Sequence, residues 1–425
     1  MTDTIFALSS GAAPAAIGVI RVSGPQANAA MRALAGRLAP PRRAVTAVLR
    51  DGSGAPLDRA LVLWLPGPHT ATGEDCAEFH LHGGRAVIAA VEAALAALPG
   101  LRRAQAGEFT RRAFINGKID LAEAEGLADL LAAETELQRQ SALALAGGTF
   151  SRLVEDWRAR LLHLSAEIEA VLDFAEDDDI AAVDERFTWN IRALADELAE
   201  WLARPRAERL REGFRVVLAG PPNAGKSTLF NALVEAEAAI TSPIPGTTRD
   251  VVARPVALAG VPFLFLDTAG LRDETADPIE RTGIDRAQGE LARADLVLWL
   301  GPDGQCPPLA WNIEAQCDRP GHEAKAHPRH RVSALTGQGL GHLREDLVAT
   351  ARAALPRPGE AALNQRQHRL LDEAHAALSA IPGLDDPLLI AEGLRLARVA
   401  FDALLGRTTT EDMLDALFGR FCIGK

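Results

Sequence analysis

The sequence predicts an α+β protein of several domains: an N-terminal α+β domain, an all-α domain in two pieces, and an α/β domain inserted between those pieces. Three observations support this prediction. Residues 1–118 mix short strand-like runs with turns, long helical patterns occupy 120–211 and return after Pro356, and strands alternate with helices from residue 214. Such alternation is typical of a parallel sheet with crossover helices.

The N-terminal domain, residues 1–118, is predicted from short apolar runs bounded by turn residues. Ile17–Val22 and Leu61–Leu65 are such runs, and each is flanked by Gly, Pro or Asp. Residues 86–98 are predicted to form a helix that ends at Pro99-Gly100. Strands and a helix in so short a segment indicate a compact α+β domain.

The helical domain is predicted at residues 119–212 and 355–425. Apolar residues recur every three or four positions, which marks one face of a long helix; they are Phe150, Leu153, Val154, Trp157, Leu161, Leu164, Ile168 and Leu172. A second helix is expected from about Asp184 to Ala203, before Pro205, and two more at 363–381 and 387–405. The α/β domain, 213–354, is therefore an insertion, which is tolerated when the termini of the inserted domain lie close together.

Composition excludes several classes of protein. With 45 Lys and Arg against 57 Asp and Glu, the net charge of −12 argues against a dominant basic surface for nucleic acid. The four cysteines show no C-x-x-C spacing, so we expect neither a zinc site nor a disulfide framework, as suits a reducing cytoplasm. The first residues lack the basic region of a signal peptide, and no apolar run approaches the ~18 residues of a membrane span. A cytoplasmic protein without a membrane association is expected.

A phosphate-binding motif begins the inserted domain. Gly220-Pro-Pro-Asn-Ala-Gly225-Lys226-Ser227 matches G-x-x-x-x-G-K-[ST], after the apolar run FRVVLAG and before a helical run. Backbone N–H groups of such a loop surround phosphate oxygens, and the helix N-terminus adds a favourable dipole. Lys226 is expected to reach the β- and γ-phosphates, and Ser227 to ligate Mg²⁺.

Two further motifs follow at suitable distances. Asp267-Thr268-Ala269-Gly270 ends the apolar run VPFLFLD, so that Asp267 can hold the magnesium shell and the Gly270 N–H can sense the γ-phosphate. Between the motifs lies Gly246-Thr247-Thr248-Arg249-Asp250. A threonine hydroxyl there, Thr248, can join Mg²⁺ only while the γ-phosphate is present, which makes an order–disorder switch.

The signal for the base is weaker. GTPases carry N-K-x-D after the next strand, and this chain has none; Ala315-Gln316-Cys317-Asp318 keeps only the aspartate. Asp318 is the candidate guanine reader, and a surface-loop aspartate is the alternative. Ser333-Ala334-Leu335 matches the loop whose backbone meets the guanine oxygen. Guanine is therefore the favoured base.

Several segments together resemble the MnmE (TrmE) family of tRNA-modification GTPases. They are IRVSGP, GPHTATGEDCAEFHLHGG, GEFTRRAFINGKIDLAEAEGLADLL, NAGKSTL, GTTRD, DTAGLR followed by IERTGIDRA, and the terminal FCIGK. The resemblance covers nearly the whole chain in domain order. The stretches NGKIDLAEAE and CIGK are the most specific, because a generic GTPase needs neither.

The resemblance implies a Ras-like G domain activated by K⁺, with the cation ligated by Asn223, Ser242, Thr247 and the Ile244 carbonyl. Glu280 matches the family's glutamate that orients the attacking water. The implied catalytic residues are therefore Glu280 and Lys226. The implied GTP-binding residues also include Ala224, Gly225, Thr228, Pro243, Pro245 and Gly246. The implied N-terminal domain binds 5-formyl- or 5,10-methylene-tetrahydrofolate through Arg21, Glu78, Lys118 and Lys425.

The same resemblance implies partners and a reaction. It predicts a homodimer that joins an FAD-dependent protein, MnmG (GidA), in a heterotetramer or larger complex. The complex would add a carboxymethylaminomethyl or aminomethyl group at C5 of the wobble uridine of certain tRNAs, using a folate-borne carbon. Cys422 in the terminal motif is either a reactive thiol or a structural residue.

This sequence departs from the family pattern in three places. Gly11-Ala-Ala-Pro-Ala-Ala-Ile17 stands where the family has a Gly-rich turn, the second switch is one residue longer, and N-K-x-D is degraded. Two alternatives remain: a regulatory GTPase without a modifying role, and a folate enzyme whose G domain has lost activity. The N-terminal segments and CIGK argue against the first, and intact Lys226, Ser227, Thr248 and Asp267 argue against the second.

Overall fold

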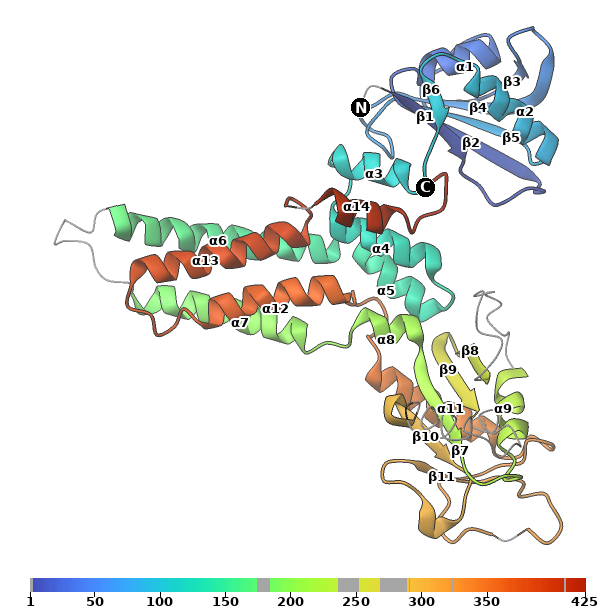
Figure 1. The fold of residues 1–425 in the computed structure, drawn as a ribbon, viewed down its shortest axis with the longest axis vertical. Helices are drawn as coiled ribbons and strands as arrows, with labels where there is room; N and C mark the ends of the chain where they lie inside the picture. Colours follow the sequence, from blue (N-terminus) through green and yellow to red (C-terminus); the bar gives the residue numbers. More distant parts are fainter. Residues whose placement is uncertain are drawn as a thin grey trace, which may run out of the picture. The chain divides into compact units, whose positions relative to one another are not determined.

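A computed structural model describes residues 3–173, 184–235, 252–267, 289, 291–322, 324–408 and 410–425. The chain divides into two compact units, residues 1–128 with 402–425, and residues 129–401. The division falls inside helices α4 (Leu121–Ala132) and α13 (Pro387–Leu404). Figure 1 shows the elements of both units.

The first unit is built on a six-stranded sheet of order β3-β4-β5-β2-β1-β6. Neighbouring strands are antiparallel except β1 and β6, which are parallel. Its strands are β1 (Thr4–Leu8), β2 (Ile17–Ser23), β3 (Ala44–Arg50), β4 (Pro56–Leu65), β5 (Cys76–His82) and β6 (Leu101–Arg103), and its helices before α4 are α1 (Ala27–Ala35), α2 (Arg85–Ala96) and α3 (Glu108–Ile115). The last helix, α14 (Glu411–Phe418), belongs to this unit as well.

One face of this sheet forms the core of the first unit. Ile20, Val22 and Phe79 are fully buried and pack with Met31 of α1 and Val91 of α2. Successive side chains of a strand point to opposite faces. The alternate residues of the same strands therefore lie on the other face, which carries two of the candidate folate residues, Arg21 and Glu78.

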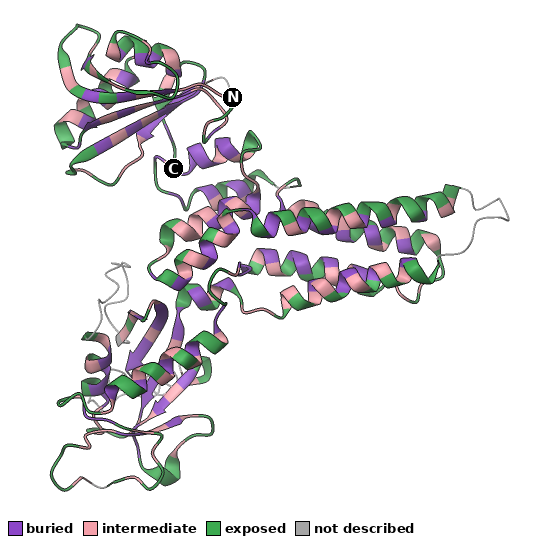
Figure 2. Ribbon diagram, turned by 180° about the vertical axis from the view of Figure 1, so that it is seen from behind, coloured by how far each residue is buried: buried purple, intermediate pink, exposed green. Residues whose placement is uncertain are grey.

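The helical part of the second unit contains α5 (Glu136–Ala146), α6 (Thr149–Asp173), α7 (Glu185–Leu202), α8 (Ala207–Glu212), α12 (Gln365–Ser379) and most of α13. Figure 2 shows that buried and exposed residues alternate along these helices. Trp157 of α6 is fully buried, stacks on Phe401 with ring centroids 6.1 Å apart, and meets Trp201 edge-on. The predicted helices at 150–172, 184–203, 363–381 and 387–405 are all present within two residues.

The rest of the second unit is an α/β domain with a sheet of order β12-β11-β10-β7-β9-β8. All neighbours are parallel except the β8–β9 hairpin. Its elements are β7 (Phe214–Ala219), α9 (Lys226–Glu235), β8 (Val252–Leu258), β9 (Val261–Asp267), β10 (Leu296–Trp299), the 3₁₀ turn η2 (Asp303–Gln305), β11 (Trp311–Glu314), β12 (His330–Arg331) and α11 (Leu340–Ala354).

Helix α5 is joined to this α/β domain through its first turn. Thr135 caps the helix in a capping box with Gln138, whose Nε2 donates to the Leu210 carbonyl at 3.0 Å. Leu137 is buried in the core of the α/β domain, and its N–H donates to the carbonyl of Gly260, in the β8–β9 turn, at 3.1 Å. The helix is therefore anchored by an apolar side chain and by its backbone.

The predicted fold class is confirmed by these observations: an N-terminal α+β domain, helices from two chain segments, and an inserted α/β domain. The boundaries predicted at 118, 212 and 354 stay predictions. Within the described ranges, no helix has the length and apolar character that crossing a bilayer requires.

Candidate functional site

The loop after β7 has the geometry that phosphate binding requires. Gly220 and Gly225 have φ of 150° and 87°, and Asn223 has φ of 62°, in the left-handed region that non-glycine residues rarely adopt. Helix α9 begins directly after the loop at Lys226, so its N-terminal dipole is directed at the loop. The Lys226 ammonium is buried and donates to the carbonyls of Gly220 at 3.0 Å and Pro221 at 2.8 Å.

Ser227 and Asp267 come together because β7 and β9 are parallel neighbours. Leu218 of β7 is paired with Asp267, the last residue of β9, so the aspartate lies beside the loop that follows β7. The Ser227 hydroxyl donates to Asp267 Oδ2 at 2.7 Å. A hydroxyl and a carboxylate oxygen at this separation fit the oxygen preference of Mg²⁺, which is commonly held by one or two protein oxygens together with phosphates. Among the described residues, no cluster of three or more His, Cys, Asp or Glu offers an all-protein metal site.

The candidate base-reading loop lies next to the phosphate loop. It follows β11, and the Cys317 N–H donates to the Val332 carbonyl at 3.3 Å, which ties it to the segment after β12. Ser333 is fully buried and its hydroxyl accepts from the Thr336 N–H at 3.1 Å, while Leu335 is exposed. Burial raises the pKa of the Cys317 thiol, and the nearby Asp318 carboxylate raises it further, so this thiol is protonated at neutral pH. The role of Asp318 as guanine reader stays a prediction.

Many predicted site residues lie outside the described ranges. They are Ser242, Pro243, Ile244, Pro245, Gly246, Thr247, Thr248, Thr268, Ala269, Gly270 and Glu280. Of the predicted K⁺ ligands, the structure therefore describes only Asn223. Of the residues predicted to hold Mg²⁺, it describes Ser227 and Asp267 but not Thr248.

In the first unit, three of the four predicted folate residues lie close together. Arg21 Nη2 pairs with Glu78 at 3.0 Å, as expected for directly paired residues of β2 and β5. The Arg21 guanidinium also lies 5.8 Å from the centre of the Phe109 ring. The N–H of Phe109 donates to the carbonyl of Lys425 at 3.2 Å, which brings the chain terminus to the same place.

The fourth residue, Lys118, follows α3 and lies against the loop between β4 and β5. A methyl group added to Gly73 would lie 2.9 Å from Lys118 Cε, so the side chain packs on the loop backbone. Asn116 donates to the Thr72 carbonyl of this loop at 2.7 Å. The role of Lys118 in folate binding stays a prediction, and the structure adds Asn116, whose hydrogen bond ties it to this loop.

A buried ionic network under this region was not predicted. Arg112 is fully buried and pairs with Glu74 at 3.0 Å, Asp3 at 2.9 Å and Glu108 at 3.3 Å. Arg102 donates to Asp3 and Glu108 as well. Arg111 and Arg112 leave the helix about 100° apart, and only the tertiary contacts show that Arg112 is the one that is buried.

The C-terminal segment is part of the first unit. Ile423 forms an isolated bridge with Ala106, and Arg111 pairs with Asp415 of α14 at 2.7 Å and with Glu411. Gly107, with φ of 66°, is so close to the Phe418 carbonyl that any side chain there would collide with it. Cys422 is exposed and carries a free thiol.

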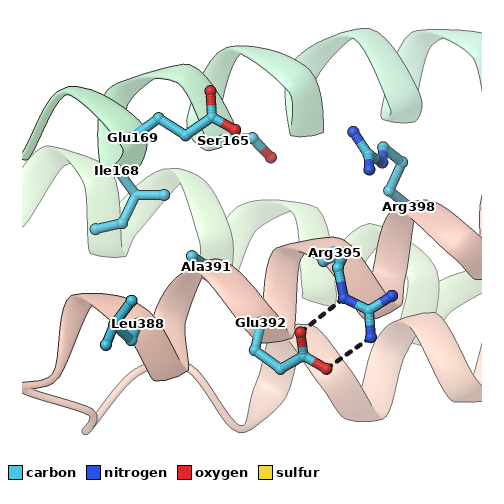
Figure 3. A pocket seen from close by; sticks show the side chains of 8 residues that line it. All are labelled: Ser165, Ile168, Glu169, Leu388, Ala391, Glu392, Arg395 and Arg398. Atoms are coloured by element: carbon cyan, nitrogen blue, oxygen red, sulfur yellow. Dashed lines mark hydrogen bonds and ion pairs between the residues drawn. The ribbon is translucent and has the colours of Figure 1, made fainter. Parts of the chain in front are cut away.

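A groove of about 250 Å³ lies between α6 and α13 in the helical part of the second unit (Figure 3). In this groove, Arg395 forms a bidentate pair with Glu392, with both contacts at 2.7 Å. Ser165 and Glu169 line the groove from α6. None of the predicted site residues lines this groove.

A glycine-rich loop between a parallel strand and a helix, with an aspartate at the end of the neighbouring strand, defines a P-loop nucleotide-binding protein. Comparison with known proteins narrows the class. The family profile described as "MnmE helical domain" matches residues 121–422, and that described as "GTP-binding protein TrmE N-terminus" matches residues 4–118. The chain therefore belongs to the MnmE (TrmE) family of GTPases.

Individual relatives of the family are similar in sequence to this chain over their full length. A Novosphingobium aromaticivorans protein named tRNA modification GTPase MnmE is 64% identical, and one of the same name from Erythrobacter litoralis is 63% identical; each alignment covers 100% of both chains. Among solved structures, the G domain of the T. maritima FeoB iron transporter is 25% identical, with 32% of this chain and 98% of that chain covered and a TM-score of 0.24.

Proposed function

We propose that this chain hydrolyses GTP and that this activity serves the modification of wobble uridines in certain tRNAs. The observation that carries the proposal is the 64% identity, over the whole chain, to a relative named tRNA modification GTPase MnmE. The Ser227–Asp267 contact beside the phosphate loop independently supports the Mg²⁺-dependent nucleotide binding that hydrolysis requires. A cytoplasmic site of action follows from the proposed substrate.

In the proposed G domain, Lys226 and the loop N–H groups bind the β- and γ-phosphates. Ser227, Thr248 and Asp267 hold Mg²⁺, which neutralises charge on the phosphate oxygens when bound. Asn223, Ser242, Ile244 and Thr247 would hold K⁺, and Glu280 would orient the attacking water. This proposal makes a direct test possible: hydrolysis should be faster in K⁺ than in Na⁺, and Glu280→Ala should slow it while leaving GTP affinity in place. Equal rates in both salts would refute the cation-activated mechanism and leave GTP binding untouched.

In the first unit we propose a site for 5-formyl- or 5,10-methylene-tetrahydrofolate formed by Arg21, Glu78, Lys118 and Lys425. A pteridine ring offers donors to a carboxylate, and an anionic glutamyl tail is recognised by cations. The Arg21–Glu78 pair and the packing of Phe109 beside it supply such groups next to an aromatic ring. The folate would supply the carbon added at C5 in aminomethyl or carboxymethylaminomethyl form, together with the FAD-dependent partner MnmG.

We propose a homodimer because the sheet of the first unit carries exposed apolar side chains on the face opposite its core. Ile17 is 59% exposed, Val48 44% and Leu61 38%. The pairings Arg21↔Glu78, Leu61↔His80 and Val48↔Arg59 place these side chains on the face that bears Arg21. Leu61→Glu should shift the mass measured by sedimentation towards the monomer, whereas Leu143→Glu, on α5, should not. Unchanged association in Leu61→Glu would contradict this placement of the interface.

The decisive experiment is nucleoside analysis of tRNA from cells that lack the protein. We expect unmodified wobble uridines to accumulate, wild-type protein to restore the modification, and Lys226→Ala to fail at equal abundance. If Lys226→Ala restored the modified uridines, the modification would not require GTP hydrolysis. Normal nucleosides in the deletion strain would instead favour a regulatory GTPase.

A further inference from the structure

Gln316 lies directly over the phosphate loop. Its Nε2 donates to the carbonyl of Asn223 at 3.4 Å. A methyl group added to Gly225 would come within 2.9 Å of Gln316 Nε2 and 3.2 Å of its Cγ, so the side chain covers this glycine closely. The contact spans 93 residues of sequence and joins the candidate base loop to the candidate phosphate loop.

The base loop itself orients the Gln316 side chain. Gln316 has φ of 56°, which turns the chain sharply after Ala315. Its carbonyl accepts from the Arg319 N–H at 3.0 Å, and its Oε1 accepts from Arg319 Nη1 at 3.5 Å. Because the amide oxygen faces a donor of its own loop, the amide nitrogen is directed towards the Asn223 carbonyl.

We propose that Gln316 is a positioning residue of the nucleotide site: it holds the phosphate loop, through the Asn223 carbonyl, in its anion-binding conformation. This inference rests on the proposed GTP binding. In the sequence Ala315-Gln316-Cys317-Asp318, Gln316 stands where N-K-x-D has its lysine. The chain thus uses a neutral donor at this position, and the site has one positive charge fewer near the phosphates.

Two consequences can be measured. Loss of the amide should weaken nucleotide binding about two- to threefold, the low end of the range expected for one hydrogen bond, because the contact of 3.4 Å is longer than usual. A lysine should keep the donor and add a charge, so it should tighten binding relative to the wild type at low salt. Because exposed charges are screened over about 10 Å at 0.1 M salt, this gain should shrink as salt rises.

The experiment measures binding and release of a fluorescent GDP by the full-length protein at 50 and 500 mM salt. Gln316→Ala should release the nucleotide faster, and Gln316→Lys should bind more tightly than both the wild type and Gln316→Ala at low salt only. Gln365→Lys, an exposed position at the start of α12, adds the same charge away from the loop and should leave binding unchanged. The salt-dependent rescue by lysine distinguishes positioning from a general loss of stability.

Two results would overturn the proposal. Wild-type affinity in Gln316→Ala would show that the contact does not support the loop, and equal affinities in Gln316→Lys and Gln316→Ala would show that the position does not sense the phosphates. Absence of GDP binding by the wild type would refute the proposed function itself, and the role of Gln316 with it.

Discussion

Leu137→Ala is predicted to loosen the α/β domain although Leu137 belongs to a helix outside it. The side chain is 5% exposed and lies in the same core as Phe214 and Phe263. Truncation of a buried leucine to alanine costs about 2–5 kcal/mol, depending on how far the cavity collapses. Gly260 accepts from the Leu137 backbone, and this bond survives the substitution, so the loss should come from packing.

Hydrogen exchange of peptides from β9 measures this loss locally and does not depend on two-state unfolding of a protein with several domains. A loss of 2–5 kcal/mol corresponds to exchange about 30- to 4,000-fold faster, because 1.4 kcal/mol is a factor of ten. The matched control is Leu143→Ala, on the same helix but 49% exposed, which should change exchange in β9 by less than about threefold. If both variants exchange alike in β9, Leu137 does not anchor α5 to this domain, and the coupling inferred from its burial is wrong.

Three further predictions concern the two sites. Ser227→Ala should remove the dependence of GTP affinity on Mg²⁺, because the hydroxyl paired with Asp267 is lost; titration of labelled GTP with and without Mg²⁺ checks this, and a preserved Mg²⁺ effect would contradict the assignment. Arg21→Ala should weaken binding of 5-formyl-tetrahydrofolate about tenfold or more, since a charge-assisted contact is lost, while Arg50→Ala at the far end of β3 should not; calorimetry measures both. Glu108 gives a pH dependence: burial raises its pKa, but the hydrogen bond from Arg102 and further contacts outweigh burial and hold the pKa below the ordinary 4.5. Its contribution to stability is therefore complete above about pH 4.5 and is lost as the pH falls through the lowered value, so the thermal midpoint of the wild type should drop there and that of Glu108→Gln should depend less on pH.

Much of the architecture could be predicted because its signals are local. The apolar face of α6 repeats every three to four residues from Phe150 to Ile168, and its positions are buried except Leu153, which is half-buried. Glycines and Lys226 at fixed spacing identify the phosphate loop from a single segment. Asp267, which begins the second motif, could be assigned to the same Mg²⁺ as Ser227 because each residue follows an apolar strand-like run.

What could not be predicted depends on contacts between distant segments. Nothing in the spacing around Gln316 indicates that its amide reaches Asn223, because that contact requires the turn after β11 to fold over the phosphate loop. Leu137 lies in the first turn of α5, which the sequence pattern assigns to the helical domain. Its side chain is nevertheless buried in the core of the α/β domain. Sequence periodicity assigns a residue to a face of its own element, and only the tertiary structure decides what covers that face.

The pairing of the C-terminal segment with the first unit has a consequence for biosynthesis. Arg111 and Asp415, which hold α14 to α3, are separated by 304 residues, and the N–H of Phe109 gains its acceptor, the Lys425 carbonyl, only when Lys425 has been made. The helical region and the α/β domain leave the ribosome in between, and chains fold largely in the order of their synthesis. The first unit therefore begins to be translated before the second unit but is completed after it, because residues 402–425 are made later. A chain that stops between the α/β domain and residue 402 would keep its phosphate loop and lack the segment that completes the Arg21 region, so such a product should bind nucleotide but not bind folate at the proposed site.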